Sequence, residues 1–150
     1  MYQLEQTTGP WWESLETFCR QLSNHKKVNI EFYPYNLDES TQKIGEEIRL
    51  IIQELITNAL KHANATEISI QVSLIDGELD VIVEDNGKGF DKKNLTKGIG
   101  LRSIEDRVKR LGGNWNLESG VGTGTIMFID VPVHKSDAKE STSLQHASVN

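Results

Sequence analysis

The chain has 150 residues, of which 37% are hydrophobic and 25% charged, and its net charge is −6. This length and composition fit one soluble globular domain, no apolar run approaches the roughly 20 residues of a membrane helix, and the acidic balance argues against non-specific nucleic-acid binding. The single cysteine, Cys19, excludes an internal disulfide and indicates a reducing compartment, and we expect it to pack as a small apolar group.

Hydrophobic periodicity divides the chain into helices and strands. Apolar residues at three- and four-residue steps predict helices, and strict alternation predicts strands. Pro34 is expected to stop the first strand, and Asp76-Gly77 between two alternating runs predicts a hairpin. The expected elements in chain order are a helix over 11–24, a strand over 28–33, a helix over 42–62, strands over 67–75 and 79–85, a helix over 99–111, and strands over 114–119 and 125–133.

This order predicts an α/β (α+β) two-layer sandwich, in which a mixed β-sheet of about five strands is covered on one face by three helices. The folded domain is expected over 11–133. A polar segment, 1–10, precedes it, and the polar residues 134–150 are expected to form a disordered tail.

The helix over 42–62 carries a polar band beside its apolar stripe. Glu54 and Asn58 are four residues apart and share one face with Lys61 and His62. An asparagine carbonyl suits Mg²⁺, which prefers oxygen ligands, and a carboxylate one turn earlier can orient a water or accept a proton. The alternative is a surface helix with ordinary polar pairs, and the glycine motifs that follow weigh against it.

The second motif is Asp85-Asn86-Gly87-Lys88-Gly89-Phe90, at the end of a strand. A carboxylate there can accept a hydrogen bond from an exocyclic amine such as that of adenine. Gly87 and Gly89 leave room for a base and permit positive φ. An ordinary Asp-Asn-Gly turn is the alternative, although the second glycine and Phe90 exceed what a turn requires.

Two glycine pairs complete the pattern. Gly98 and Gly100 directly precede a helix, whose first N–H groups form a natural phosphate site, and Lys97 adds positive charge. The second pair, Gly122 and Gly124, enters the last strand. The next residue, Thr125, can hydrogen-bond an adenine edge directly or through a water; the alternative is an ordinary β-branched strand residue.

Taken together, these boxes resemble those of the GHKL ATPase superfamily, which includes gyrase and the histidine kinases. The stretch 54–63 resembles its N box, and 85–90, 98–101 and 122–125 resemble its glycine boxes. The resemblance is closer still to the ATP-binding catalytic domain of nitrate-sensor-type bacterial histidine kinases. It covers roughly 12–133 and implies the Bergerat fold.

The resemblance also implies ligands and residue roles. The expected cofactors are ATP and Mg²⁺, with Asn58 as metal ligand, Glu54 as the catalytic group for a proton or water, and Asp85 for adenine N6. Lys61 and His62 are expected near the phosphates. The nucleotide-binding set is Asn58, Lys61, His62, Asp85, Gly87, Gly89, Lys97, Gly98, Gly100, Leu101, Gly122, Gly124 and Thr125.

Such kinases pass the γ-phosphate of ATP to a histidine on a separate dimerisation domain, for relay to a response regulator. None of the four histidines fits the acceptor, so we expect a catalytic fragment or a stand-alone domain that binds ATP with little autokinase activity. We expect a cytoplasmic domain of a free or membrane-anchored kinase, with no direct membrane or nucleic-acid contact.

Two other functions remain open at this stage. An anti-sigma-factor-type serine kinase shares the fold and is naturally this short. A nucleotide-gated interaction module would bind the nucleotide without transferring phosphate, and the presence of both Glu54 and Asn58 argues against it.

Overall fold

The computed structural model describes residues 9–89 and 101–133. Three helices and five strands follow one another in the predicted order, with a short 3₁₀ helix in addition. In chain order they are α1 (Trp11–His25), β1 (Asn29–Tyr35), η1 (Glu39–Thr41), α2 (Gln42–His62), β2 (Glu67–Ile75), β3 (Glu78–Asp85), α3 (Leu101–Arg110), β4 (Asn114–Gly120) and β5 (Gly124–Pro132).

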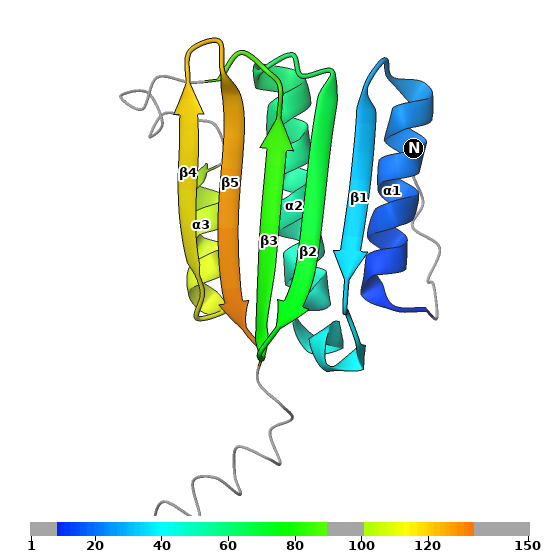
Figure 1. The fold of residues 1–150 in the computed structure, drawn as a ribbon, viewed down its shortest axis with the longest axis vertical. Helices are drawn as coiled ribbons and strands as arrows, with labels where there is room; N and C mark the ends of the chain where they lie inside the picture. Colours follow the sequence, from blue (N-terminus) through cyan, green and yellow to red (C-terminus); the bar gives the residue numbers. More distant parts are fainter. Residues whose placement is uncertain (1–8, 90–100, 134–150) are drawn as a thin grey trace, which may run out of the picture.

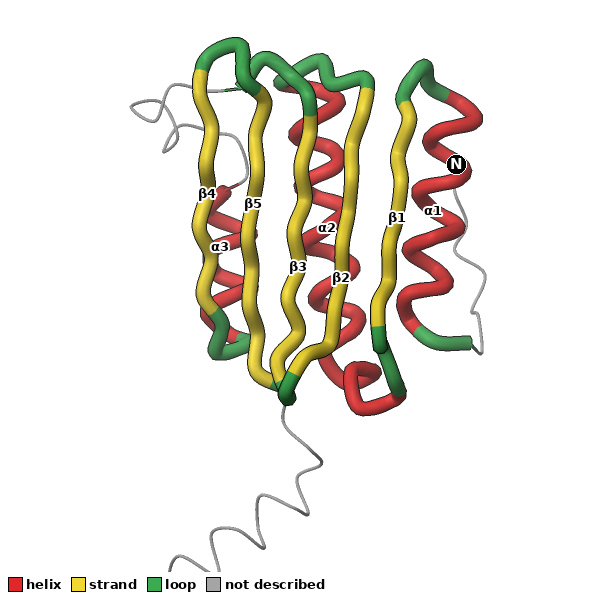
Figure 2. The backbone as a smooth tube through the Cα atoms, viewed as in Figure 1, coloured by secondary structure: helices red, strands yellow, loops and turns green. Residues whose placement is uncertain are grey.

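The five strands form one mixed sheet in the order β1-β2-β3-β5-β4. β1 pairs parallel with β2, and the remaining neighbours pair antiparallel. Figure 1 shows the three helices together behind the sheet, and the backbone trace in Figure 2 shows the same two layers. The predicted α/β two-layer sandwich is therefore confirmed.

The core lies between the sheet and the helices. Leu79, Val81 and Val83 alternate along β3 and are buried on the helix side, which is the pattern of a strand with one covered face. Ile52 and Ile56 of α2 are fully buried in the same core. α2 thus covers the centre of the sheet, and α1 and α3 flank it.

Cys19 packs inside this core, as expected for a small apolar group. Its side chain is buried, and burial, with a smaller contribution from the charge of Glu16, raises the pKa of the thiol to about 12. A thiol with that pKa stays protonated and chemically inert in the folded chain.

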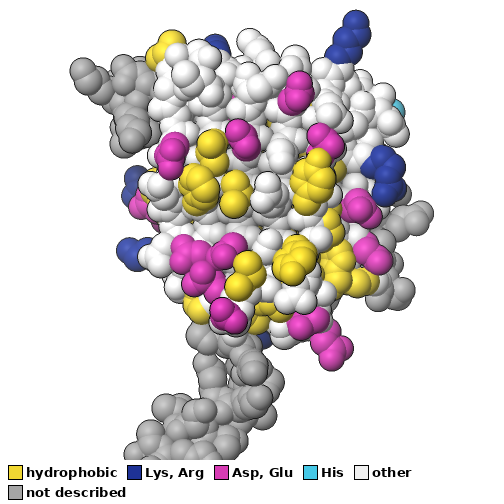
Figure 3. Space-filling view, in the orientation of Figure 1, with side chains coloured by type: hydrophobic (Ala, Val, Ile, Leu, Met, Phe, Trp, Pro, Cys, Tyr) yellow, Lys and Arg dark blue, Asp and Glu magenta, His cyan; other side chains and the backbone are white. Residues whose placement is uncertain are grey.

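The other face of the sheet faces away from the helices. Figure 3 shows it as apolar side chains surrounded by acidic ones. Within the described strands, the outward positions carry no Lys, Arg or His. Their carboxylates come from all five strands and are Glu31, Glu67, Glu78, Asp80, Glu84, Glu118 and Asp130.

The expectation that Pro34 stops the first strand is wrong. β1 runs through Pro34 to Tyr35, and Pro34 lies opposite Val72 of β2. β1 is an edge strand of the sheet. A proline is tolerated there because its missing N–H can face away from the ladder.

The remaining structural expectations concern the chain ends and membranes. In the described ranges, no helix is long and apolar enough to cross a bilayer. The expected disordered tail over 134–150, and residues 1–8 of the polar leading segment, lie outside the described residues.

Candidate functional site

Three segments that are far apart in the sequence meet at one end of the sheet: the end of α2, the loop after β3, and the turn between β4 and β5 (Figure 1). The backbone N–H of Lys88 donates to the Ala63 carbonyl at 2.9 Å, and the N–H of Gly122 donates to the Lys88 carbonyl at 2.6 Å. The Asp85–Gly89 loop thus joins the end of α2, where the predicted N-box residues lie, to the glycine pair of the β4–β5 turn.

Asn86 anchors the loop after β3 to β2. Its side-chain oxygen accepts the backbone N–H groups of Thr66 and Glu67, each at 2.9 Å, and its amide nitrogen donates to the Thr66 hydroxyl at 2.9 Å. The sequence analysis treated Asn86 only as part of a turn. An asparagine between an aspartate and a glycine is the signal that was present, because its side chain commonly bonds nearby backbone.

Asp85 ends β3 on the helix side of the sheet, directly opposite Thr125 of β5. One carboxylate oxygen accepts the Gly87 N–H at 2.7 Å, which leaves the other oxygen for a ligand. Burial raises the pKa of Asp85, the Gly87 N–H acts in the opposite direction, and the charge of Glu84 raises it further. Asp85 is therefore a partly desolvated acceptor in a fixed orientation.

Glycine is required at the points where this loop and the β4–β5 turn approach each other. Gly124 has φ of +80°, and a Cβ there would overlap the Asp85 carbonyl oxygen. Gly89 has φ of +69°, and a Cβ there would overlap the Gly120 carbonyl oxygen. Both glycines allow the closest backbone contacts in the site.

Thr125 is buried and its hydroxyl is held by a neighbour on β4. The hydroxyls of Ser119 and Thr125 are 2.9 Å apart, and the Ser119 hydroxyl also donates to the Gly124 carbonyl at 3.1 Å. Ser119 was not among the predicted site residues. Its register opposite Thr125 becomes apparent only from the pairing of β4 with β5.

The polar residues of α2 differ in exposure. Asn58 is only 7% exposed, whereas Lys61 and His62 in the last turn are exposed. Among the residues that the structure describes, none hydrogen-bonds the Asn58 amide. Within the described residues, the Asn58 amide atoms keep contact with solvent, so the carbonyl oxygen can be reached by a ligand.

Glu54 lies in a groove between the three helices. The groove has a volume of about 320 Å³ and is lined from α1, α2 and α3 by Phe18, Leu50, Gln53, Glu54, Thr57, Ser103 and Arg107. Glu54 is half-buried and shares the groove with the guanidinium-bearing Arg107. Its carboxylate is therefore open to a group that approaches along the helical layer.

Some of the predicted residues stand apart from this assembly. Lys97, Gly98 and Gly100 lie outside the described residues. Leu101 is the first residue of α3 and packs against the hydrophobic core. The structure brings together Asp85, Gly87, Gly89, Gly122, Gly124 and Thr125 at the end of α2.

These residues fit a nucleotide with Mg²⁺. Within 9–89 and 101–133 there is no group of three or more His, Cys, Asp or Glu that would form a complete protein cage for a metal. Mg²⁺ commonly takes few protein ligands and completes its shell with phosphate oxygens and waters. The Asn58 amide, which no described residue hydrogen-bonds, can supply one such oxygen, and Asp85 has an oxygen free for a donor.

The sequence profile of the histidine kinase-, DNA gyrase B-, and HSP90-like ATPases matches residues 44–135. That range contains α2 except for its first two residues, the whole Asp85–Gly89 loop and the β4–β5 turn. The matched segment therefore includes every part of the assembly described above.

Individual relatives are similar over the same region. The signal transduction histidine-protein kinase/phosphatase DegS of Bacillus subtilis is 37% identical over 115 residues, which make up 71% of this chain and 30% of DegS. The sensor protein VraS of Staphylococcus aureus is 30% identical over 96 residues, or 63% of this chain and 28% of VraS. The chain thus spans less than a third of the length of these relatives.

Among solved structures, the histidine kinase domain of the Erythrobacter litoralis EL346 blue-light activated histidine kinase is similar with a TM-score of 0.69. The sequences are 25% identical, and the match covers 89% of this chain and 65% of that one.

Proposed function

We propose a function from one premise: this chain belongs to the family of histidine kinase-, DNA gyrase B-, and HSP90-like ATPases. Its relatives are sensor histidine kinases, and it is an ATPase domain of the histidine-kinase kind. The finer statements below, on residues, metal, acceptor and partners, are our proposal.

In this proposal the chain binds ATP between α2, the Asp85–Gly89 loop and the β4–β5 turn. The Asp85 carboxylate accepts a hydrogen bond from the exocyclic amine of adenine, and Thr125 supports the same edge. Asn58 offers its carbonyl oxygen to Mg²⁺, with Lys61 and His62 at the phosphate side. The observation that carries the proposal is the desolvated Asp85, held by the Gly87 N–H opposite Thr125.

The reaction we propose is transfer of the γ-phosphoryl group of ATP to a histidine on a separate dimerisation domain, followed by relay to a response regulator. When bound, Mg²⁺ supplies charge neutralisation at the phosphates. The chain supplies orientation, and Glu54 takes up a proton or positions a water from its groove among the helices. We place the chain in the nitrate-sensor-type subgroup because of the short interval between Gly89 and Gly98.

The first test is calorimetric titration of the chain with a non-hydrolysable ATP analogue, with and without Mg²⁺, and with the GTP analogue as control. We expect adenine-selective binding that Mg²⁺ strengthens. Asn58→Ala should remove the Mg²⁺ effect and leave the adenine preference, because the two depend on different side chains. Equal binding of ATP and GTP analogues would refute the role given to Asp85.

The second test separates the histidine kinase from an anti-sigma-factor-type serine kinase. The chain is incubated with labelled ATP and the dimerisation domain of a related kinase, and the product is treated with acid. Phosphohistidine is lost in acid and phosphoserine survives. Label on the acceptor domain that resists acid would favour the serine kinase, and ATP binding without any transfer would favour an interaction module.

A further inference from the structure

β4 forms a free edge of the sheet. It is the last strand in the order β1-β2-β3-β5-β4, and among the described strands it pairs with β5 alone. An edge strand presents unpaired N–H and C=O groups, and natural proteins commonly block such edges with proline, lysine or a bulge. The opposite edge strand, β1, carries Pro34, whereas β4 has neither a proline nor a lysine.

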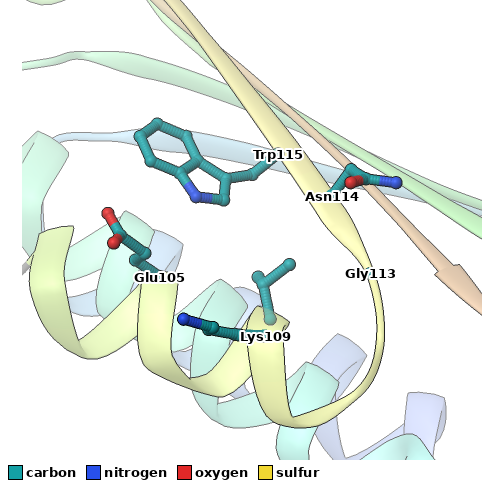
Figure 4. A pocket seen from close by; sticks show the side chains of 6 residues that line it. Glu105, Lys109, Gly113, Asn114 and Trp115 are labelled. Atoms are coloured by element: carbon teal, nitrogen blue, oxygen red, sulfur yellow. The ribbon is translucent and has the colours of Figure 1, made fainter.

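Beside this edge, β4 and α3 enclose a groove of about 350 Å³. Trp115 projects from β4 over α3 and is 37% exposed, although Val108, which lines the same groove, is fully buried (Figure 4). Figure 4 shows Glu105 and Lys109 rising from α3 toward the same groove. The groove therefore combines a large apolar ring with one acidic and one basic group, next to unpaired backbone.

The two charges are available for an outside partner. Neither Glu105 nor Lys109 forms an ion pair with another residue that the structure describes. They are one helical turn apart, so the groove carries a negative and a positive site in a fixed order along α3. This order makes the groove self-complementary. A two-fold axis perpendicular to the sheet would run the α3 helices of two copies in opposite directions, so that Glu105 of each copy comes close to Lys109 of the other.

We propose that a second copy of this chain docks on the free edge, with β4 pairing antiparallel to its counterpart about a two-fold axis beside Trp115. The two sheets become one continuous sheet, the two Trp115 rings bury each other, and Glu105 of each copy faces Lys109 of the other. With the axis at Trp115, Asn114 of one copy lies opposite Asn116 of the other, and Leu117 lies opposite Gly113. The ladder between the two copies is therefore short, limited to residues 114–116 of each β4, and it opposes no like charges.

The open face of the sheet is a poorer choice for a second copy. Its outward positions carry many carboxylates and, in the described strands, no Lys, Arg or His. Two such faces would repel each other, whereas the β4 edge offers both signs of charge. The contact involves one short strand and one helix, so we expect a weak, concentration-dependent dimer. The proposal does not depend on nucleotide binding or on phosphoryl transfer.

Sedimentation velocity of the full chain, without nucleotide, tests the pairing over about 10 μM to 1 mM, the range of a weak complex. We expect the mean mass to rise toward that of a dimer. Glu105→Lys and Lys109→Glu should each weaken association by about tenfold, because each places like charges together at two symmetric contacts. Asp106→Lys is the control, since it makes the same charge change on α3 outside the groove.

A mixture of the two single variants gives the sharpest result. In a mixed dimer, Lys at 105 of one copy faces Glu at 109 of the other, and the native Lys109 faces the native Glu105. The mixture should therefore associate more strongly than either variant alone, and the double variant should recover the wild-type strength. Circular dichroism of each variant confirms that it is folded before it is compared.

Three results would overturn the proposal. One is a single monomeric species up to 1 mM, the upper limit set above. Another is equal weakening by Glu105→Lys and Asp106→Lys, which would show that the loss does not depend on a position inside the groove. The third is a mixture of the single variants that associates no better than its components.

Discussion

Asp85 is subject to two opposing demands. Its carboxylate is partly desolvated, and burial raises its pKa, whereas an ionised acceptor is what we propose adenine recognition needs. A raised folded-state pKa means that the ionised form costs stability. That cost is absent below the ordinary aspartate pKa of about 4 and appears as the pH rises through the folded-state pKa.

We therefore predict that Asp85→Asn raises the unfolding free energy of the nucleotide-free chain at pH 7. The difference from wild type should disappear about one unit below pH 4, where Asp85 is protonated in both the folded and the unfolded state. Urea titrations at the two pH values measure it. The same variant should lose its preference for the ATP analogue over the GTP analogue. A variant less stable than wild type at pH 7 would show that the carboxylate stabilises the loop instead.

The glycines of the β4–β5 turn offer a matched pair for a second prediction. Gly122 and Gly124 both have φ of +80°, but a Cβ at Gly122 meets nothing within 4 Å, whereas one at Gly124 overlaps the Asp85 carbonyl oxygen. Gly122→Ala should cost only the left-handed backbone penalty, about 1 kcal/mol. Gly124→Ala carries the same penalty and must also separate the turn from β3.

We expect Gly124→Ala to destabilise the chain by at least about 1 kcal/mol more than Gly122→Ala, because a backbone overlap has no flexible side chain to relieve it. It should also weaken ATP-analogue binding more strongly than Gly122→Ala does. Urea unfolding and calorimetry measure the two effects. Equal losses for the two variants would mean that backbone strain alone matters in this turn.

At the scale of elements, α2 contains a glycine where helix propensity would favour alanine. Gly45 is buried, and a Cβ there would overlap the indole ring of Trp11, whose Nε1 donates to the Thr41 hydroxyl at 2.9 Å. Alanine gains about 1 kcal/mol over glycine within a helix. Overpacking typically costs about 1–3 kcal/mol, so the two effects oppose each other.

We predict a net loss of stability, by about 1 kcal/mol, for Gly45→Ala, since α1 and α2 must separate to admit the methyl group. In a Trp11→Ala background the overlap is gone, and Gly45→Ala should become stabilising. Thermal unfolding of the four chains in this double-mutant cycle measures the coupling. If alanine stabilises both backgrounds, the close approach of α1 to α2 is not a constraint.

Local patterns predicted the elements well, because helices and hairpins depend on neighbouring residues. The hairpin at Asp76-Gly77 and the long helix α2 are examples. The strand order, with β5 between β3 and β4, depends on long-range pairing that periodicity does not encode. The end of β1 was misplaced for the same reason, since the effect of Pro34 depends on β1 being an edge strand.

For the site, the sequence supplied chemically competent residues but not their contacts. The two hydrogen bonds of Lys88 that join the three motifs use its backbone N–H and carbonyl groups. Every residue type except proline has both groups, so the amino-acid sequence does not reveal these bonds. Asn86 and Ser119 were missed because their partners come from other strands. The experiments above test the roles proposed for Asp85, Asn58 and Glu54.

At the scale of the whole molecule, α3 is the least firmly held of the helices. Only Ile104 and Val108 are buried among its side chains, whereas α2 buries a long apolar stripe. Leu101 packs partly buried against the core, and two ion pairs add to this: Glu47 of α2 accepts Arg107 at 3.1 Å and lies 3.5 Å from Arg110. Elements with few buried contacts open locally before the whole domain unfolds.

We therefore predict that α3 amides exchange with deuterium faster than those of β3 and β5, and that Glu47→Gln speeds α3 alone. These partly exposed pairs are worth about 0.2–1 kcal/mol, so the increase should be up to about fivefold. Glu46→Gln is the matched control, because Glu46 pairs with Arg49 within α2 and not with α3. Uniform acceleration of all elements by Glu47→Gln would mean that α3 and the sheet open only together, as one cooperative unit.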